Sequence, residues 1–419
     1  MNFKTKLLVA PLFLVSSFLF GQITTNVEGS KYEFKKIVQH EATPVESQGK
    51  TSTCWSFSAL SFFESEIMRI NGKKEITPLS EMFVVRKAYE MKATKFIRVD
   101  GKINFAQGGA FHDIPLVIEN YGIVPMPIYA GFGDKNFSAN DFDLKGTPKK
   151  GVELKYNHET LYTELKDYMN EVVEQSNNGN GLAINWKQNL IELLDRNLGK
   201  DIQSFEWQGK KYTPRSYADE LGLEMDNYVS LTSFTNHPMY SKCMLEIPDN
   251  WAWGESYNVP LDDLFDATVE ALKNGYTVAW GADVSEKGFS FKNGIAIVPK
   301  DESTIEVKGQ DNKGFNNAGA DRSSNAFLNP TEELKITQEI RQLGYDNKTT
   351  QDDHGMHIVG LYQDQNGKNY FLVKNSWGTN NLPKGYLYVS ESYFKYKTIN
   401  IYLHKDGILN TTKSKIKLY

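Results

Sequence analysis

Four short apolar segments close the chain, and they constrain its fold more than any other feature. They read "HIVGLYQ", "NYFLVK", "GYLYVS" and "INIYLH". Each has the length and the β-branched or aromatic content typical of a strand. Asn366-Gly367 stands between the first two, and this dipeptide is a strong signal for a hairpin turn. The C-terminal part is therefore predicted to form an antiparallel sheet.

The N-terminal part follows a helical pattern instead. Apolar residues recur at spacings of three and four from Leu60 to Ile70, which predicts a helix that begins at Cys54. Ser52 or Thr53 is expected to cap its start, and Asn71-Gly72 to end it. Helices at the front of the chain and strands at its end predict an α+β fold.

Two further helices are expected in this part of the chain. Thr77 is predicted to cap the first of them, with Pro78 at its first position. The second is predicted within "GGAFHDIPLVIENYG" and ends at Gly122. No internal repeat is present in the sequence.

The first residues have the layout of a secretory signal peptide. Lys4 and Lys6 precede an apolar run from Leu7 to Phe20, too short for a comfortable membrane span. Residues 1–21 are therefore expected to be removed, and residues 22–419 to be exported to the periplasm or the exterior. No contact with a membrane is expected after this removal.

Composition excludes some classes of protein. Hydrophobic residues make up 40% and aromatic residues 13% of the chain, enough for a substantial core. The formal net charge is −5, whereas a nucleic-acid-binding protein normally carries a basic excess. No nucleic-acid partner is expected.

Only two cysteines are present, Cys54 and Cys243. An exported chain can form disulfides, but two cysteines do not make a disulfide framework. They also cannot build a zinc site without histidines at ligand spacing, and no such spacing is found. Cys243 is expected to be a small buried residue, which leaves Cys54 as a candidate nucleophile.

The surroundings of Cys54 in the sequence favour a nucleophilic role. A thiol in the first turn of a helix lies among unpaired N–H groups that favour the thiolate. Gln48 lies six residues earlier and carries an amide NH2. Together with the backbone N–H of Cys54, this amide could stabilise an oxyanion.

The segment "DDHGMHIVGLYQDQNGKNYFLVKNSWG" supplies a base and a residue to orient it. His354 or His357 could act with Cys54, and only one of them can face it, because residues three apart on a strand point to opposite faces. Asn375 could hydrogen bond the imidazole, and Trp377 could cover that bond. Asp352, Asp353 and His354 could alternatively be read as metal ligands.

These residues together resemble the papain-like cysteine peptidases. The resemblance rests on Gln48, on Thr53-Cys54-Trp55, on Asp353-His354 and on Lys374-Asn375-Ser376-Trp377-Gly378. It favours His354 over His357, because the family's histidine precedes a Val-Gly-like pair by five and six residues. Thr51 and Ser52 depart from the family signature, which has Cys and Gly at these positions.

The long separation of Cys54 and His354 indicates one branch of that family. The core is expanded by about 150 residues relative to the usual spacing. Further similarities to the bleomycin hydrolase/aminopeptidase C branch lie in Pro78–Val85, Gly108–Pro125 and Leu272–Val284. The resemblance implies one papain-like domain with a helical part that carries the catalytic helix, an antiparallel β part and large helical insertions. The insertions are expected at about 130–255 and 300–350, followed by a C-terminal tail at 405–419.

The resemblance implies a peptidase that works through a Cys-His-Asn triad and an acyl-enzyme. Cys54, His354, Asn375 and Gln48 are the expected catalytic residues. Gly108, Gly109 and Trp377 are expected to bind substrate, although Gly108-Gly109 could equally be a turn at a helix start.

The specificity implied by this branch is that of an aminopeptidase, because its C-terminus occupies the cleft. The carboxylate of Tyr419 could therefore recognise an α-amine. An endopeptidase with an open cleft, an acyltransferase of the transglutaminase-like kind and a catalytically silent peptide-binding homologue remain alternatives. Peptides are the expected partners, a homo-oligomer is possible, and neither cofactor nor metal is implied.

Overall fold

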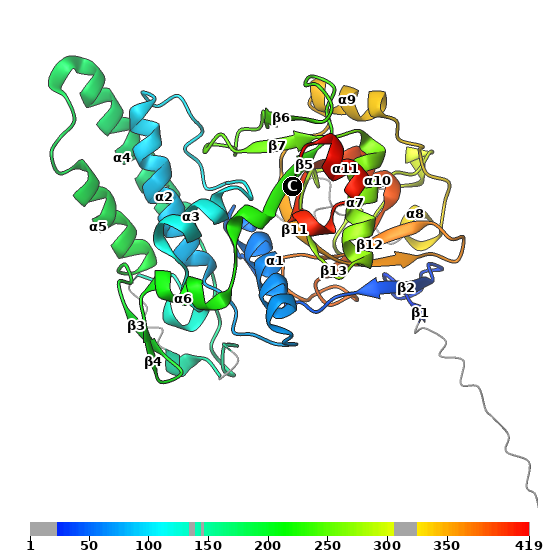
Figure 1. Cartoon of the computed structure of the whole chain (residues 1–419), viewed down its shortest axis with the longest axis horizontal. Coiled ribbons are helices and arrows are strands. Elements are labelled where there is room, and N and C mark those ends of the chain that lie inside the picture. Colours follow the sequence, from blue (N-terminus) through cyan, green and yellow to red (C-terminus); the bar gives the residue numbers. More distant parts are fainter. Residues whose placement is uncertain (1–22, 134–138, 144–145, 306–324, 419) are drawn as a thin grey trace, which may run out of the picture.

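Two lobes face each other in the computed structural model of the chain, one helical and one built on a large sheet (Figure 1). The structure describes residues 23–133, 139–143, 146–305 and 325–418. The predicted α+β class is confirmed, since helices form the first lobe and the C-terminal segments enter the sheet of the second.

The helical lobe holds the first part of the chain. Its helices enclose one apolar core, to which Phe62, Phe83 and Leu165 contribute fully buried side chains. A small separate hairpin packs on this lobe through Tyr212. The elements of the lobe are α1 (Cys54–Asn71), α2 (Glu81–Arg98), α3 (Asp113–Tyr121), α4 (Glu159–Gln175), α5 (Trp186–Leu198), α6 (Pro214–Leu221), β3 (Phe205–Trp207) and β4 (Lys210–Tyr212).

The second lobe is built on a twelve-stranded sheet in the order β6-β7-β5-β14-β8-β11-β12-β13-β10-β9, with β2 joining β11 and β1 joining β2. Most pairs are antiparallel, and two pairs, β5–β7 and β10–β13, are parallel. The strands are β1 (Ile23–Thr24), β2 (Phe34–Gln39), β5 (Tyr228–Thr232), β6 (Ser241–Met244), β7 (Glu255–Asn258), β8 (Val278–Ala282), β9 (Phe289–Ser290), β10 (Ile295–Ala296), β11 (His354–Gln363), β12 (Asn369–Lys374), β13 (Tyr386–Ser390) and β14 (Thr398–His404).

Helices of the same lobe supply the rest of its core. Side chains of α7 and α10, among them Phe265 and Phe394, pack on the sheet beside Trp280. The helices are α7 (Leu261–Lys273), α8 (Asn325–Leu328), α9 (Gln338–Asp346), α10 (Glu391–Lys397) and α11 (Asn410–Lys415).

The four predicted C-terminal strands are confirmed as β11 to β14, and the predicted hairpin joins β11 to β12. Gly367 takes a positive φ of 79° in that turn, a conformation that glycine adopts without strain. Gly72 likewise ends α1 in the left-handed region, as predicted.

One prediction about helix caps was wrong, and a second was correct only in the position of the cap. The second helix begins at Glu81 rather than at Pro78, and Ser80 caps it by accepting a hydrogen bond from the N–H of Phe83. The preceding residue, Leu79, forms a bridge with Pro125 and is therefore held out of the helix. At the first helix, Thr53 occupies the cap position, but its side chain makes no capping hydrogen bond.

The expected insertion at about 130–255 is only partly helical. Its first portion supplies α4, α5 and α6 to the helical lobe, whereas its last portion supplies β5, β6 and the start of β7 to the sheet. Residues 306–324 of the expected insertion at 300–350 lie outside the described residues, and the part that follows contains α8 and α9.

Helix α1 of the helical lobe packs directly against β11 of the sheet. The approach is so close that a Cβ added to Gly355 would lie 2.6 Å from Ser58 Oγ and 3.3 Å from Trp55 Cα. A side chain at this position would require Ser58 Oγ to move and α1 to shift by a few tenths of an ångström, so glycine is favoured here. Because Cys54 begins α1 and His354 begins β11, this contact brings together residues far apart in the sequence.

Buried polar groups cross the same interface. Lys374 Nζ donates hydrogen bonds to Ser61 Oγ on α1 at 2.7 Å and to Thr43 Oγ1 at 3.0 Å. Thr43 in turn donates to Glu64 Oε2, and the N–H of Leu79 donates to Glu64 Oε1 at 2.7 Å. Burial raises the pKa of Glu64 to about 7 and lowers the pKa of Lys374. The two lobes are thus joined by a polar network as well as by apolar packing.

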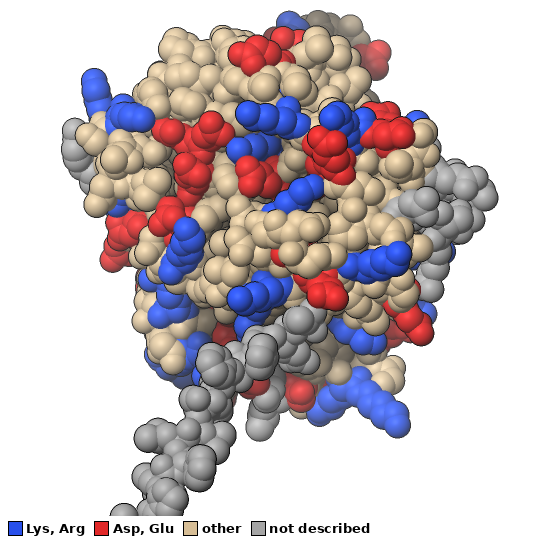
Figure 2. All heavy atoms as spheres, turned by 90° about the vertical axis from the view of Figure 1, so that its right-hand side faces the viewer, with Lys and Arg blue, Asp and Glu red and all other residues tan. Residues whose placement is uncertain are grey.

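Surface features agree with the composition. On the face shown in Figure 2, basic and acidic side chains are interspersed and do not gather into one basic patch. Among the described residues, no helix is long and apolar enough to cross a membrane.

Lys374→Met tests the polar network between the lobes. The substitution removes the donor to Ser61 and Thr43 and the positive charge near Glu64, so we expect the free energy of unfolding to fall by about 3 kcal/mol. Denaturation followed by circular dichroism measures this change. Lys187→Met on the exposed face of α5 is the control and is expected to change it by less than about 0.5 kcal/mol. Equal effects of the two substitutions would contradict a stabilising role of the network.

Candidate active site

Cys54 lies at the first position of α1, as the sequence predicts. Its side chain is buried and it is not part of a disulfide. Hydrogen bonds from the backbone at Gly355 and Trp55 lower the pKa of the thiol, but burial outweighs them and raises it to about 12. Near neutral pH the thiol by itself therefore stays protonated.

Gln48 is held in a fixed orientation beside the segment that follows β12. Its Nε2 donates to Thr51 O at 2.7 Å, and its Oε1 accepts from Ser376 Oγ at 2.7 Å. Its backbone N–H also donates to Ser376 O at 2.9 Å. An amide nitrogen has two donors, so one N–H of Gln48 remains for another acceptor.

The hydrogen bond between His354 and Asn375 is present, as the sequence predicts. His354 Nε2 lies 2.7 Å from Asn375 Oδ1, and both side chains are buried. The ring of Trp377 lies against the imidazole with 4.6 Å between ring centroids. Asn375 Oδ1 also accepts from the N–H of Ser376, which fixes the amide. This arrangement orients the imidazole through Nε2.

His354 and Cys54 each resist carrying a charge alone. Burial lowers the pKa of His354 to about 4, and it raises the pKa of the thiol. A proton that moves from Cys54 to His354 leaves the net charge of the pocket at zero, so this transfer avoids most of the cost of burying one isolated charge.

The alternative histidine, His357, belongs to the network between the lobes. Its Nδ1 lies 2.9 Å from Ser61 Oγ, the hydroxyl that also accepts from Lys374. Burial, followed by the charge of Lys374, lowers the pKa of His357 well below its usual value. His357 therefore contacts the middle of α1, and His354 alone shares the pocket of Cys54.

That pocket lies between the lobes. It is lined by Cys54, Trp55, Gly109, Ala110, Phe111, Ile247, Asp249, Gly281, Asp352, Asp353, His354, Gly355 and Asn400. Sequence reasoning did not find the carboxylate of Asp249, which comes from a distant segment, and it considered Asp352 only as a metal ligand. Among the described residues, no group of three or more His, Cys, Asp or Glu side chains could hold a metal ion.

The two glycines expected to bind substrate are closely packed. A Cβ at Gly108 would lie 1.8 Å from Asp249 Oδ2, and one at Gly109 would lie 2.8 Å from the ring of Trp55. A side chain at either position would require these neighbouring side chains to move. Gly109 lines the pocket of Cys54, and substrate binding by either glycine stays a prediction.

Cys243 lies in β6 and is buried with a free thiol, as the sequence predicts. It does not line the pocket of Cys54.

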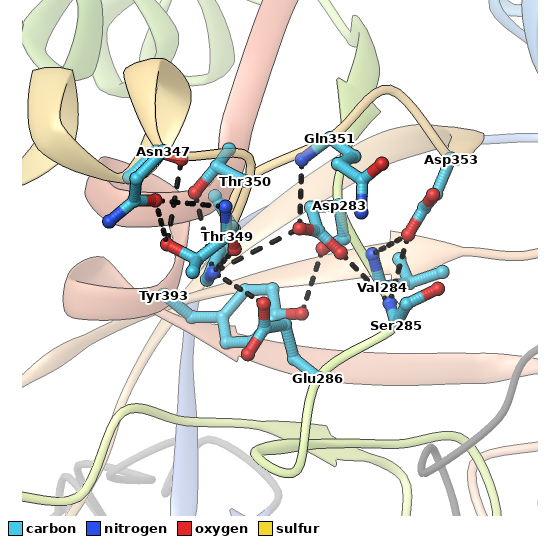
Figure 3. Close-up of polar contacts among 12 residues, drawn as sticks. Asp283, Val284, Ser285, Glu286, Asn347, Thr349, Thr350, Gln351, Asp353 and Tyr393 are labelled. Atoms are coloured by element: carbon cyan, nitrogen blue, oxygen red, sulfur yellow. Dashed lines mark hydrogen bonds and ion pairs between the residues drawn. The ribbon is translucent and has the colours of Figure 1, made fainter.

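Two carboxylates fix the segment that leads into His354 (Figure 3). Asp283 follows β8 and accepts hydrogen bonds from the N–H groups of Ser285 and Gln351, both at 2.9 Å. Asp353 accepts from the N–H groups of Val284 at 3.3 Å and Ser285 at 3.1 Å. The chain just before His354 is thereby tied to the segment after β8.

The ionisation of Asp283 is strongly perturbed. Burial, then a hydrogen bond and the charge of Asp353, raise its pKa to about 8, against the opposing charge of Lys397. Lys397 Nζ lies 3.9 Å from Asp283 Oδ2 and also contacts Glu286. Near neutral pH Asp283 therefore keeps its proton and can share it with Asp353.

Comparisons with known proteins agree on one family for this chain. The chain matches the Peptidase C1-like family over residues 21–314 and the papain family of cysteine proteases over residues 334–403. Aminopeptidase C of Lactococcus lactis subsp. cremoris is 22% identical over 394 residues, covering 87% of this chain and 81% of the relative. Bleomycin hydrolase of Mus musculus is 21% identical over 424 residues, covering 91% and 84%.

A solved structure supports the fold. The crystal structure of PepW from Lactobacillus rhamnosis HN001 has a TM-score of 0.64 and 18% identity, covering 91% of this chain and 84% of that one. The fold and the branch expected from the sequence are both confirmed.

Asp283→Asn tests the shared proton. In the folded chain Asp283 holds its proton up to about pH 8, whereas an unfolded chain releases it near its ordinary value of 3.8. The folded state thus binds one more proton between these values, and its stability must fall as pH rises through this window. Asparagine cannot ionise. Between pH 5 and pH 8 the free energy of unfolding of the variant should therefore fall by at least about 1 kcal/mol less than that of the wild type.

The measurement is thermal denaturation at several pH values. Asp167→Asn, at an exposed carboxylate on α4, is the control and should keep the pH dependence of the wild type. An unchanged pH dependence in Asp283→Asn would contradict the shared proton.

Proposed function

The chain belongs to the Peptidase C1-like family and is a cysteine peptidase, and we propose that Cys54, His354, Asn375 and Gln48 carry out its reaction. The observation that supports this assignment best is the hydrogen bond between the buried imidazole of His354 and Asn375. His354 also lines the pocket of Cys54.

In this proposal the thiol of Cys54 attacks the carbonyl carbon of a peptide bond. Its proton passes to Nδ1 of His354, and the negative oxygen accepts hydrogen bonds from the N–H of Cys54 and from Gln48 Nε2. Collapse of this intermediate breaks the C–N bond. His354 gives its proton to the leaving amine, and the acyl group stays on Cys54 as a thioester.

Water completes the cycle. His354 takes a proton from a water molecule that attacks the thioester, and the second tetrahedral intermediate releases a carboxylic acid and the Cys54 thiol. Asn375 keeps the imidazole oriented in both halves, and Trp377 covers it from one side. No cofactor takes part in these steps.

The proposed specificity is that of an aminopeptidase, which releases single residues from free amino termini. It is supported by relatives named aminopeptidase C and aminopeptidase E, which the chain matches over most of their length. Endopeptidase activity is the second candidate. It is favoured by the position of the C-terminal tail, of which residues 405–418 do not line the pocket of Cys54.

The proposed location is outside the cytoplasm, supported by the signal-like composition of residues 1–21. Those residues lie outside the part of the chain that the structure describes. Assembly into a homo-oligomer stays a prediction.

The first test uses paired fluorogenic substrates, leucine aminomethylcoumarin and its N-acetyl derivative, under reducing conditions. The proposal predicts cleavage of the free-amine substrate and at least a 1,000-fold loss of kcat, on the order expected for a lost nucleophile, in Cys54→Ala. Cys243→Ala is the control and should retain activity. Equal cleavage of both substrates would establish an endopeptidase, and full activity of Cys54→Ala would contradict the assigned nucleophile.

A second test removes the amide of Gln48. Loss of one oxyanion donor costs roughly 100-fold in kcat, and we expect Gln48→Ala to show a loss of this order with KM nearly unchanged. Steady-state kinetics separate the two parameters. A raised KM with an unchanged kcat would show that Gln48 binds the substrate rather than the transition state.

A further inference from the structure

The loop between β6 and β7 crosses from the sheet to the helical lobe. β6 and β7 extend from the sheet toward that lobe (Figure 1), and residues 245–254, here called the crossing loop, join them. Trp251 of this loop is buried, and its Nε1 donates to Asp113 Oδ2 in α3 at 2.6 Å. Asn104 Nδ2 donates to Asp249 Oδ1 at 3.0 Å. The crossing loop is thus continuous with the sheet through β6 and β7 and hydrogen bonded to the helical lobe.

The crossing loop narrows the pocket of Cys54. Ile247 and Asp249 line this pocket together with Cys54, Gly109 and His354. The cavity has a volume of about 30 Å³, and on this measure roughly 10–15 Å³ is enough to hold one water molecule. A group the size of an ammonium can therefore enter it.

The position of His354 decides which half of a substrate lies here. His354 must reach the leaving nitrogen, so the leaving half lies beside the imidazole. The acyl half lies on the other side of the sulfur, and Gly109 and the crossing loop line the same pocket. We therefore assign the end of the pocket lined by the crossing loop to the amino-terminal side of the bond that is cut.

Two carboxylates line this end of the pocket, Asp249 from the crossing loop and Asp352 from the segment before β11. Within the described residues, the Asp352 carboxylate accepts no hydrogen bond. Burial raises the pKa of Asp352, and the charge of Asp249 raises it further. Burial also raises the pKa of Cys54, and the charges of Asp249 and Asp352 add to this effect. A cation bound between them would relieve this repulsion.

This pocket is expected to receive a ligand because it holds the proposed nucleophile, Cys54. The expectation does not depend on its acidic residues. In a cysteine peptidase the sulfur and the attacked carbonyl meet in the same space. The α-nitrogen of an amino-terminal residue is two bonds from that carbonyl carbon. A free α-ammonium of the acylating residue must therefore lie within the small pocket that Cys54 shares with Asp249 and Asp352.

We propose that Asp249 and Asp352 bind the α-ammonium group of the substrate's first residue, so that the crossing loop restricts the enzyme to single-residue release. This inference rests on the proposed function and names the residues that set its specificity. It assigns recognition of the α-ammonium group to the side chains of Asp249 and Asp352, whereas the sequence alone suggested the carboxylate of Tyr419.

The tail is occupied elsewhere in its described part. Ile408 and Ile416 are buried in the core of the sheet lobe, and Lys415 Nζ lies 3.0 Å from Tyr240 OH and 3.6 Å from Asp263 Oδ2 on α7. Tyr419 itself lies outside the described residues. A variant that lacks Tyr419 therefore separates the two possible sources of a carboxylate.

The test measures kcat/KM for leucine aminomethylcoumarin relative to its N-acetyl derivative in Asp249→Asn, Asp352→Asn and the double variant. We expect this ratio to fall at least tenfold in the double variant, chiefly through a higher KM for the free amine, because one lost charge pair is worth roughly a factor of ten. Glu246→Gln, an exposed carboxylate of the same loop, is the control and should keep the wild-type ratio.

Protection of Cys54 from iodoacetamide gives a readout that does not need turnover. Leucinamide should protect the wild-type thiol better than N-acetyl-leucinamide, and the double variant should lose this difference. The inference is overturned if the double variant keeps both the wild-type kcat/KM ratio and the wild-type difference in protection. If deletion of Tyr419 abolishes both, the recognition belongs to the tail instead. If the wild type cleaves neither substrate and Cys54 is unreactive, the proposed function itself fails.

Discussion

The contact between α1 and β11 is the constraint on which the rest of the structure depends. Gly355 lets the helix approach the strand closely, because a Cβ there would lie 3.3 Å from Trp55 Cα, and Lys374 ties the helix to the sheet through Ser61. Burying an ammonium is unfavourable unless its donors are used, so this group stabilises only one relative position of the two lobes. That position places the first residue of α1 beside the first residue of β11.

The site follows from this geometry. Cys54 and His354 are each buried, and each would be costly to charge alone, but they can exchange a proton without a change in net charge. Asn375 and Trp377 hold the imidazole on one side. On the other side the crossing loop brings Asp249 next to the same pocket. The chemistry and the proposed selectivity for amino termini thus share one pocket.

Local patterns in the sequence predicted much of this structure. The strands β11 to β14 and the turn at Asn366-Gly367 follow from side-chain type and turn propensity, which act over a few residues. The family motifs gave the contact of His354 with Asn375. The start of α2 was missed because the N–H of Leu79 is satisfied by Glu64, a contact that no local pattern reveals. The position of Asp249 depends in the same way on Asn104, 145 residues away.

The rate of alkylation of Cys54 near pH 6 tests the central claim most directly, which is that Cys54 and His354 act as one proton-exchanging pair. Iodoacetamide labelling followed by peptide mass mapping would report Cys54 and Cys243 in the same sample, in the wild type and in His354→Ala. The account predicts that Cys54 reacts at least about tenfold faster than Cys243 and that His354→Ala removes this difference, since only the thiolate is reactive. Equal rates for the two cysteines, or a Cys54 rate unaffected by the loss of His354, would contradict it.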